Sequence, residues 1–92
     1  MKFTKENLAA EICKAITFEY DIICFIGSEI DFNGVIVYVG GKAFSKEKLS
    51  GGVEFHYCEI DEIEVYHEDP SEDFVFNNDE LIEMEELVKL WM

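Results

Sequence analysis

The sequence predicts an α+β domain, with a helix near each end of the chain and an antiparallel sheet of three to four strands between them. Three observations predict this class: helical apolar periodicity near both ends, short β-rich apolar runs in the centre, and an Asn-Gly dipeptide between the first two runs. Because the order is helix, strands, helix, both helices are expected to pack on one face of the sheet. Residues 1–92 are expected to form a single domain around one core.

The first helix is marked by the signals at its start. Thr4 is a favourable N-cap, and Phe3 and Leu8 have the spacing of a hydrophobic staple. Apolar residues then recur with helical period at Leu8, Ala9, Ile12, Ala15 and Ile16. This pattern predicts a helix that runs to about residue 18.

Two apolar runs predict the first pair of strands. Residues 22–26 and 35–39 are rich in β-branched and aromatic side chains, and glycine follows each run. Between them, Asn33-Gly34 favours a tight turn because both residues tolerate positive φ, so the strands are expected to be antiparallel. Residues 42–52 contain lysines, serines and a closing glycine pair, which predicts a flexible connection to the rest of the sheet.

The next segment predicts further strands. Apolar and polar residues alternate over residues 53–58, and the alternation fails at residues 59–62, where acids fall on both faces. A turn or bulge that separates two strands is expected there, with one long bent strand as the alternative. Residues 74–76 predict a short edge strand.

The last helix has the same start signals as the first. Asn77 is the expected N-cap with Glu80 as its reciprocal acceptor, and Phe76 and Leu81 have staple spacing. One broad apolar stripe is expected to face the core, made of Leu81, Met84, Leu87, Val88 and Trp91. Two further apolar residues fall on the acidic side of this helix, as satellite packing or as part of a contact surface: Ile82 and Leu90.

The net charge is strongly negative and unevenly distributed. The chain has 21 acids and 7 basic residues, a formal net charge of −14. Residues 1–52 carry seven acids and six lysines, a net of −1, whereas residues 53–92 carry fourteen acids and one lysine, a net of −13. Such a field repels nucleic acid and anionic membranes and attracts basic surfaces, so neither nucleic acid nor membrane is an expected partner. All basic residues are lysines, so no arginine is available for bidentate phosphate binding.

No motif for nucleotide, phosphate, zinc or acyl-transfer chemistry is present. The two histidines, His56 and His67, lie near no glycine-rich or nucleophile-bearing segment, so an enzyme is not expected and no catalytic residue is assigned. A zinc site built around His56 and Cys58 is a weaker interpretation than a half-exposed histidine and a small core residue. Acid-rich residues 69–73 lack the glycine and distal glutamate of a calcium loop. No cofactor and no metal are predicted.

The cysteines and the apolar runs bear on location. Three cysteines without CxxC spacing favour buried, reduced thiols over a disulfide framework: Cys13, Cys24 and Cys58. The first residues lack a signal-peptide pattern, and the longest apolar run, residues 22–26, is too short to cross a membrane. A soluble, cytoplasmic protein is expected.

The strongest functional signal is the acidic tract of residues 59–86. Side chains at alternate strand positions recur after about 6.6–6.8 Å, so Glu62, Glu64 and Glu68 are expected to form a row on one face. Seven residues are predicted to bind a partner: Glu62, Glu64, Tyr66, Glu68, Asp69, Glu72 and Asp73. The simpler interpretation is a surface that serves solubility alone, but the self-repulsion of a net −13 is more than solubility requires.

These features predict three alternative functions. The first is a small inhibitor whose acidic face mimics nucleic acid in the basic groove of a DNA- or RNA-binding enzyme, comparable in size and charge alone to anti-CRISPR and anti-restriction proteins. The second is an immunity or antitoxin protein that blocks a basic toxin through an aromatic hot spot drawn from Tyr66, Phe74, Phe76 or Trp91. The third is a homo-oligomeric scaffold or small-ligand module that associates through an exposed strand edge or through Ile82 and Leu90. The expected partner is a basic protein surface, and the expected state is a monomer or weak homodimer.

Overall fold

The computed structural model describes residues 3–18 and 23–92. The described chain is α+β, with a helix before and a helix after an antiparallel sheet, as the sequence predicts. Its elements are α1 (Lys5–Ala15), β1 (Ile23–Phe32), β2 (Val35–Glu47), β3 (Val53–Tyr66), the short 3-10 helix η1 (Pro70–Glu72), β4 (Phe74–Val75) and α2 (Asn78–Trp91).

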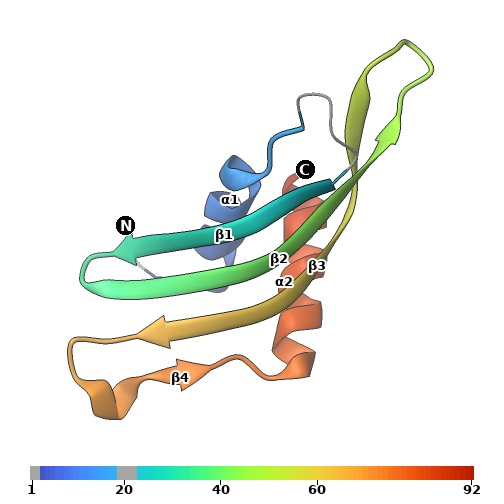
Figure 1. The fold of residues 1–92 in the computed structure, drawn as a ribbon. Helices are drawn as coiled ribbons and strands as arrows, with labels where there is room; N and C mark the ends of the chain where they lie inside the picture. The colour runs from blue at the N-terminus through green and yellow to red at the C-terminus, as the bar shows by residue number, and fades with distance from the viewer. Residues whose placement is uncertain (1–2, 19–22) are drawn as a thin grey trace.

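The sheet is a meander in which each strand pairs with its neighbour in sequence. The strand order is β1-β2-β3-β4, and every pair is antiparallel. β4 is the predicted edge strand. Both helices lie side by side behind the same face of the sheet (Figure 1). The opposite face is not covered by any described element, so one broad sheet surface is open to solvent.

The core lies between the helices and the sheet. Its largest fully buried side chains come from both helices and three strands: Phe32, Leu8, Ile12, Ile63, Met84, Val37, Val39, Val65 and Val88. Burying such side chains stabilises the fold by roughly 25 cal/mol per Å² of apolar surface removed from water. Because strand side chains alternate, the residues between these buried positions point to the opposite face.

α1 begins as expected and ends early. The Thr4 hydroxyl oxygen accepts a hydrogen bond from the Asn7 backbone N–H at 3.0 Å. The helix ends at Ala15 rather than at about residue 18, and Ile16 is already extended at φ −86° and ψ 110°. Ile16 and Thr17 are consecutive β-branched residues with lowered helix propensity, and Ile16 remains buried in the extended form. The predicted start is confirmed and the predicted end is wrong.

β1 and β2 extend well beyond the apolar runs that predicted them. The turn between them is at Asn33-Gly34, where φ is 54° and 93°, which confirms the predicted hairpin. β2 continues to Glu47, and the next turn lies within residues 48–52. The prediction of a flexible connection is therefore wrong for residues 42–47. Residues 42–44 pair with both β1 and β3, and residues 45–47 pair with β3 alone in an arm that extends beyond the helices (Figure 1).

β3 is one long strand with two irregularities. The first is a register shift opposite Gly40 and Gly41, where Asp61 is the extra residue on β3. The irregularity is present where it was predicted, as a bulge. The bulge does not separate two strands, so the alternative prediction of one long bent strand is the correct one. A Cβ on Gly41 would lie 2.3 Å from the Glu59 carbonyl oxygen, so the bulge brings two backbones too close for any other residue. At the second shift, His56 is the extra residue.

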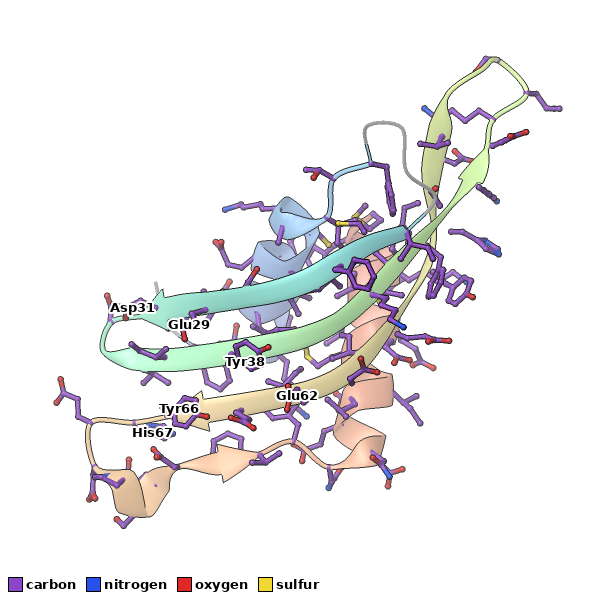
Figure 2. The ribbon with its side chains drawn as sticks, viewed as in Figure 1. Glu29, Asp31, Tyr38, Glu62, Tyr66 and His67 are labelled. Atoms are coloured by element: carbon purple, nitrogen blue, oxygen red, sulfur yellow. The ribbon has the colours of Figure 1, made fainter. Side chains whose placement is uncertain are left out.

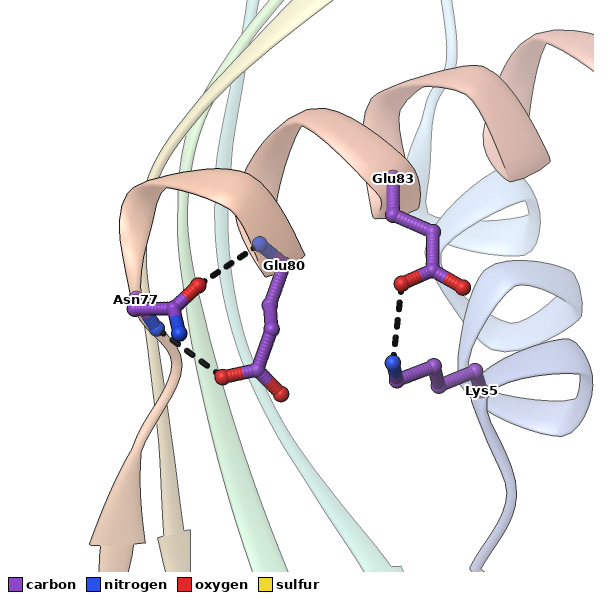
Figure 3. Close-up of polar contacts among 4 residues, drawn as sticks. All are labelled: Lys5, Asn77, Glu80 and Glu83. Carbon is purple, nitrogen blue, oxygen red and sulfur yellow. Dashed lines mark hydrogen bonds and ion pairs between the residues drawn. The ribbon is translucent and has the colours of Figure 1, made fainter.

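α2 is fixed at its start by a capping box. The Asn77 side-chain oxygen accepts from the Glu80 N–H at 2.9 Å, and the Glu80 carboxylate accepts from the Asn77 N–H at 3.2 Å (Figure 3). Further along, the Glu83 carboxylate lies 2.8 Å from the Lys5 ammonium on α1 (Figure 3). This hydrogen bond raises the pKa of Lys5. The pair is exposed, so it joins the two helices with only a small effect on stability.

Candidate functional site

The candidate site is the sheet face opposite the helices, called here the outer face. Figure 2 draws the molecule from this side. Several neighbours of the outer-face residues are buried in the core, among them Ile26, Val37 and Ile63, so the alternation of the strands directs the outer-face side chains away from the helices. Its acidic part is called the acidic patch and consists of Glu29, Asp31, Tyr38, Glu62, Glu64 and Tyr66.

The register of the sheet brings acids from two non-adjacent strands together. Tyr38 on β2 is paired with Glu29 on one side and with Glu64 on the other. Neighbouring strands lie about 4.8 Å apart, so the backbones at Glu29 and Glu64 are about 9.6 Å apart. Glu62 pairs with Gly40, where an added Cβ would lie 3.3 Å from the Glu62 carboxylate. The glycine thus leaves the space that the Glu62 side chain occupies.

The next row of the acidic patch lies at the hairpin end of the sheet. Ile36 pairs with Asp31 on β1 and with Tyr66 on β3. The Asp31 carboxylate accepts from the Gly34 N–H at 2.8 Å, which holds this acid at the turn. The Tyr66 hydroxyl donates to the Glu64 carboxylate, and this hydrogen bond raises the pKa of Tyr66. Tyr66 therefore remains a neutral hydrogen-bond donor on a negatively charged surface.

The acids of the patch are not neutralised by lysine. Among residues 3–18 and 23–92, the ion pairs of the lysines lie elsewhere, at Lys5–Glu83, Lys14–Glu11 and Lys46–Glu54, and His67 is in contact with Glu72, which is an ion pair only when His67 is protonated. Lys42 on β2 also lies on the outer face, where its Nζ is 5.9 Å from the centre of the Phe25 ring. The patch therefore presents its negative charge directly to solvent.

Three other predicted binding residues, Asp69, Glu72 and Asp73, belong to the loop around η1. This loop begins at His67, which is labelled beside Tyr66 in Figure 2. The Asp69 carboxylate accepts hydrogen bonds from the Ser71 backbone N–H at 3.0 Å and from the Ser71 hydroxyl at 2.9 Å. The hydrogen bond from the Ser71 backbone N–H lowers the pKa of Asp69. The Asp73 carboxylate accepts from the His67 N–H at 2.6 Å, and a Glu72 oxygen lies 3.7 Å from His67 Nδ1. These acids hold the shape of the loop as well as carrying charge.

Glu68 is not part of the predicted strand row. β3 ends at Tyr66, because the chain then turns through η1 to bring β4 alongside β3. The Glu68 carboxylate lies instead next to the hairpin turn, where a Cβ on Gly34 would be 3.1 Å from it. A shallow pocket between this turn and the η1 loop is lined by residues that include Glu68, Asp69 and Glu72. The structure therefore places the predicted residues in two neighbouring groups, one on β3 and one in the loop.

Sequence reasoning missed the contribution of β1 and β2 to the site. Glu29 and Asp31 on β1 and Tyr38 on β2 join the residues predicted from β3. The sequence does contain a signal for the two acids of β1. If the strand alternation that includes Phe25 is continued past Gly27, Glu29 and Asp31 fall on the outer face. Glycine is uncommon inside strands, which favoured ending the strand at Gly27.

The described residues offer no metal site. No group of three or more His, Cys, Asp or Glu side chains among them is arranged to hold an ion. His56 is exposed, whereas Cys58 is buried with its sulfur 4.0 Å from the Glu85 carbonyl oxygen. Burial raises the pKa of Cys58 to about 12, so it stays a neutral thiol. Cys13 and Cys24 are only half-buried, so the expectation of buried cysteines holds for Cys58 alone.

No protein-family model, curated protein or solved structure matches this chain. Neither of the helices in the described residues is long and apolar enough to span a membrane. Functional inference therefore rests on the geometry and charge of the outer face.

Proposed function

We propose that this protein is a small acidic inhibitor that mimics nucleic acid and occupies the basic groove of a DNA- or RNA-binding enzyme. The observation that supports this function most directly is the acidic patch, in which carboxylates from β1 and β3 share one solvent-facing surface without lysine partners. A basic groove attracts such a surface at long range and neutralises it on contact. The comparison with anti-CRISPR and anti-restriction proteins is an analogy of size and charge alone.

The spacing of the acids supports mimicry of a duplex. Glu62 and Glu64 repeat after about 6.7 Å along β3, and Glu29 lies about 9.6 Å across the sheet from Glu64. Carboxylates thus lie in two rows, as the phosphates of a duplex do, and the rows are spaced more widely than the minor groove of B-DNA, about 6 Å, and less widely than the major groove, about 12 Å. The loop acids at η1 extend the negative surface at one end. Free thiols at Cys13, Cys24 and Cys58 are consistent with action in the cytosol.

The test is affinity capture from host lysate with three baits. The first bait is the native protein, and the second carries Glu29→Gln and Glu62→Gln in the acidic patch. The third, matched bait carries Asp79→Asn and Glu86→Gln, which remove the same charge from exposed positions on α2. Bound proteins are released with increasing salt and identified by mass spectrometry, and each is challenged with duplex DNA and with RNA.

The native and α2 baits are expected to retain a nucleic-acid enzyme that salt releases and nucleic acid displaces. The patch bait is expected to lose it, because ion pairs with a basic groove carry the affinity. Equal capture by all three baits, or capture that nucleic acid does not displace, would contradict the mimic.

A second candidate function is an immunity or antitoxin protein that covers the active site of a basic toxin. Exposed aromatic side chains on the same face favour it: Phe25 is 74% exposed, Tyr66 44% and Tyr57 40%. Aromatic residues dominate binding hot spots. Phe76, considered from the sequence, is only 5% exposed and is not available to a partner.

Single substitutions separate the two functions once a partner has been captured. For an immunity protein, Phe25→Ala or Tyr66→Ala is expected to weaken binding by about 2 kcal/mol or more, with little change in salt dependence. For a nucleic-acid mimic, Glu62→Gln is expected to reduce both the affinity and its salt dependence, while Phe25→Ala has the smaller effect.

A further inference from the structure

We propose that a second copy of this chain pairs antiparallel with the free edge of β1, which gives a two-fold dimer with one continuous sheet. β1 forms one edge of the four-stranded sheet and is 10 residues long. Its pairing with β2 runs from Ile23 to Phe32 without a register shift. The dimer is independent of the inhibitor function, since it needs no other partner.

The two edges of the sheet are built differently. β4, the opposite edge, has only two residues. Edge strands of monomeric proteins are usually kept short, bulged, or interrupted by lysine or proline, because an open edge pairs with other chains. β1 is long and unbulged and contains neither lysine nor proline, and its two charged residues, Glu29 and Asp31, both lie in its second half. Among the described residues no other strand pairs with its outer edge, so its backbone groups are open to a further strand.

The distribution of charge selects this edge for contact between two copies. Residues 1–52, which include β1, carry a net charge of −1, whereas residues 53–92 carry −13. The strand order places β1 farthest across the sheet from β4. β1 itself brings two acids to the interface, Glu29 and Asp31, but pairing through β1 keeps the fourteen acids of residues 53–92 in one copy away from those in the other. Contact through the β4 edge would instead bring like charges together.

The side chains of β1 are complementary to themselves when the strand is reversed. The outer-face positions are apolar at the start of the strand, Ile23 and Phe25, and acidic at its end, Glu29 and Asp31. Antiparallel pairing centred on Gly27 sets Glu29 of one copy opposite Phe25 of the other. Like charges, which would destabilise directly opposed positions, are thereby avoided.

Lys42 adds an attractive contact in the same register. Lys42 pairs with Phe25 across β1 and β2, and its ammonium lies 5.9 Å from the centre of the Phe25 ring. In the paired dimer, Glu29 of the second copy follows Phe25 in the same row. The Lys42 ammonium, which lies over the Phe25 ring, is therefore next to the Glu29 carboxylate of the second copy. The two-fold symmetry of the dimer produces this contact twice.

Gly27 fits the centre of this interface. It is exposed, its φ is not positive, and an added Cβ would meet nothing within 4 Å. The fold of one chain therefore does not require glycine here, although glycine weakens a strand interior. Glycine inside a strand often marks the close approach of another backbone.

Sedimentation equilibrium of the purified native chain over a wide concentration range tests the dimer. The average mass is expected to rise from 10.7 kDa towards twice that value. Phe25→Glu places a carboxylate opposite Glu29 of the second copy at both symmetric contacts and is expected to raise the dimer dissociation constant by about tenfold. Adding Glu29→Lys to Phe25→Glu turns each repulsive contact into an attractive one and is expected to restore association.

The matched control is Val75→Glu, which adds the same charge to an exposed position at the β4 edge and is expected to leave the mass unchanged. All of these positions are exposed, and circular dichroism verifies that each variant is folded. A chain that stays monomeric at every concentration would overturn the proposal. So would a dimer that Phe25→Glu and Val75→Glu weaken equally, or one that the double variant fails to restore.

Discussion

Neutralising two acids of the acidic patch, by Glu29→Gln together with Glu62→Gln, is expected to make the fold more stable. Both side chains are exposed, and neither is in an ion pair among the described residues. Both face Glu64 on the outer face, one along β3 and one across the sheet. The substitutions therefore relieve repulsion and remove no favourable contact. A gain in stability would mean that the charges are retained for something other than folding.

Strand geometry sets the size of the effect. The distances are about 6.7 Å between Glu62 and Glu64, 9.6 Å between Glu29 and Glu64, and 12 Å between Glu29 and Glu62. In water, three such pairs together repel by about 1.4 kcal/mol at low ionic strength. A Debye length of about 8 Å at physiological ionic strength reduces this repulsion to about 0.5 kcal/mol. The double variant is expected to gain free energy of unfolding by these amounts.

Urea unfolding followed by circular dichroism, at low and at physiological salt, measures the gain. In thermal unfolding, 1 kcal/mol corresponds to about 4–8 °C for a domain of this size. The matched control is Glu54→Gln, because Glu54 lies 3.8 Å from the Lys46 ammonium and its loss relieves no comparable repulsion. A double variant that is less stable than the native protein, or a gain that salt does not reduce, would refute the electrostatic reasoning.

Three further predictions concern the fold itself. Asn77→Ala removes the capping box of α2 and is expected to lower the free energy of unfolding by about 1 kcal/mol, measured with urea. Gly41→Ala is expected to destabilise by about 1–3 kcal/mol, because its Cβ would lie 2.3 Å from the Glu59 carbonyl oxygen, whereas Gly27→Ala meets open space and is expected to cause no loss of stability. Cys58 is expected to resist thiol reagents in the folded protein, because burial raises its pKa to about 12. Since the unfolded thiol ionises at a lower pH, the contribution of Cys58 to stability is present at neutral pH and is lost as pH rises towards about 12.

Specific results would contradict each of these three predictions. An unchanged urea midpoint for Asn77→Ala would mean that packing alone fixes the start of α2. Equal losses for Gly41→Ala and Gly27→Ala would mean that the close approach of the two backbones at the bulge is not the reason position 41 requires glycine. Rapid modification of Cys58 without unfolding would mean that the region between β3 and α2 opens readily.

Features whose interacting groups lie within a few residues of each other were predictable from the amino-acid sequence. The Asn33-Gly34 turn, the Thr4 cap and the Asn77–Glu80 capping box were all predicted and are present. The fold class followed from these signals and from the periodicity between them. The acidic character of β3 and of the η1 loop was also predictable, because the charge of a segment depends only on its own residues.

Features that depend on pairing between distant segments could be established from the folded chain alone. Residues 42–47 have the composition of a loop, yet they are strand because β3 satisfies their backbone hydrogen bonds. The end of α1 at Ala15 was also beyond local signals, because the chain leaves the helix while Ile16 stays in the core. The acidic patch depends on register, which brings Glu29 to the same row as Glu64, 35 positions later in the chain. Local sequence sets which residues turn, cap and alternate, but long-range hydrogen bonding sets which of them become neighbours.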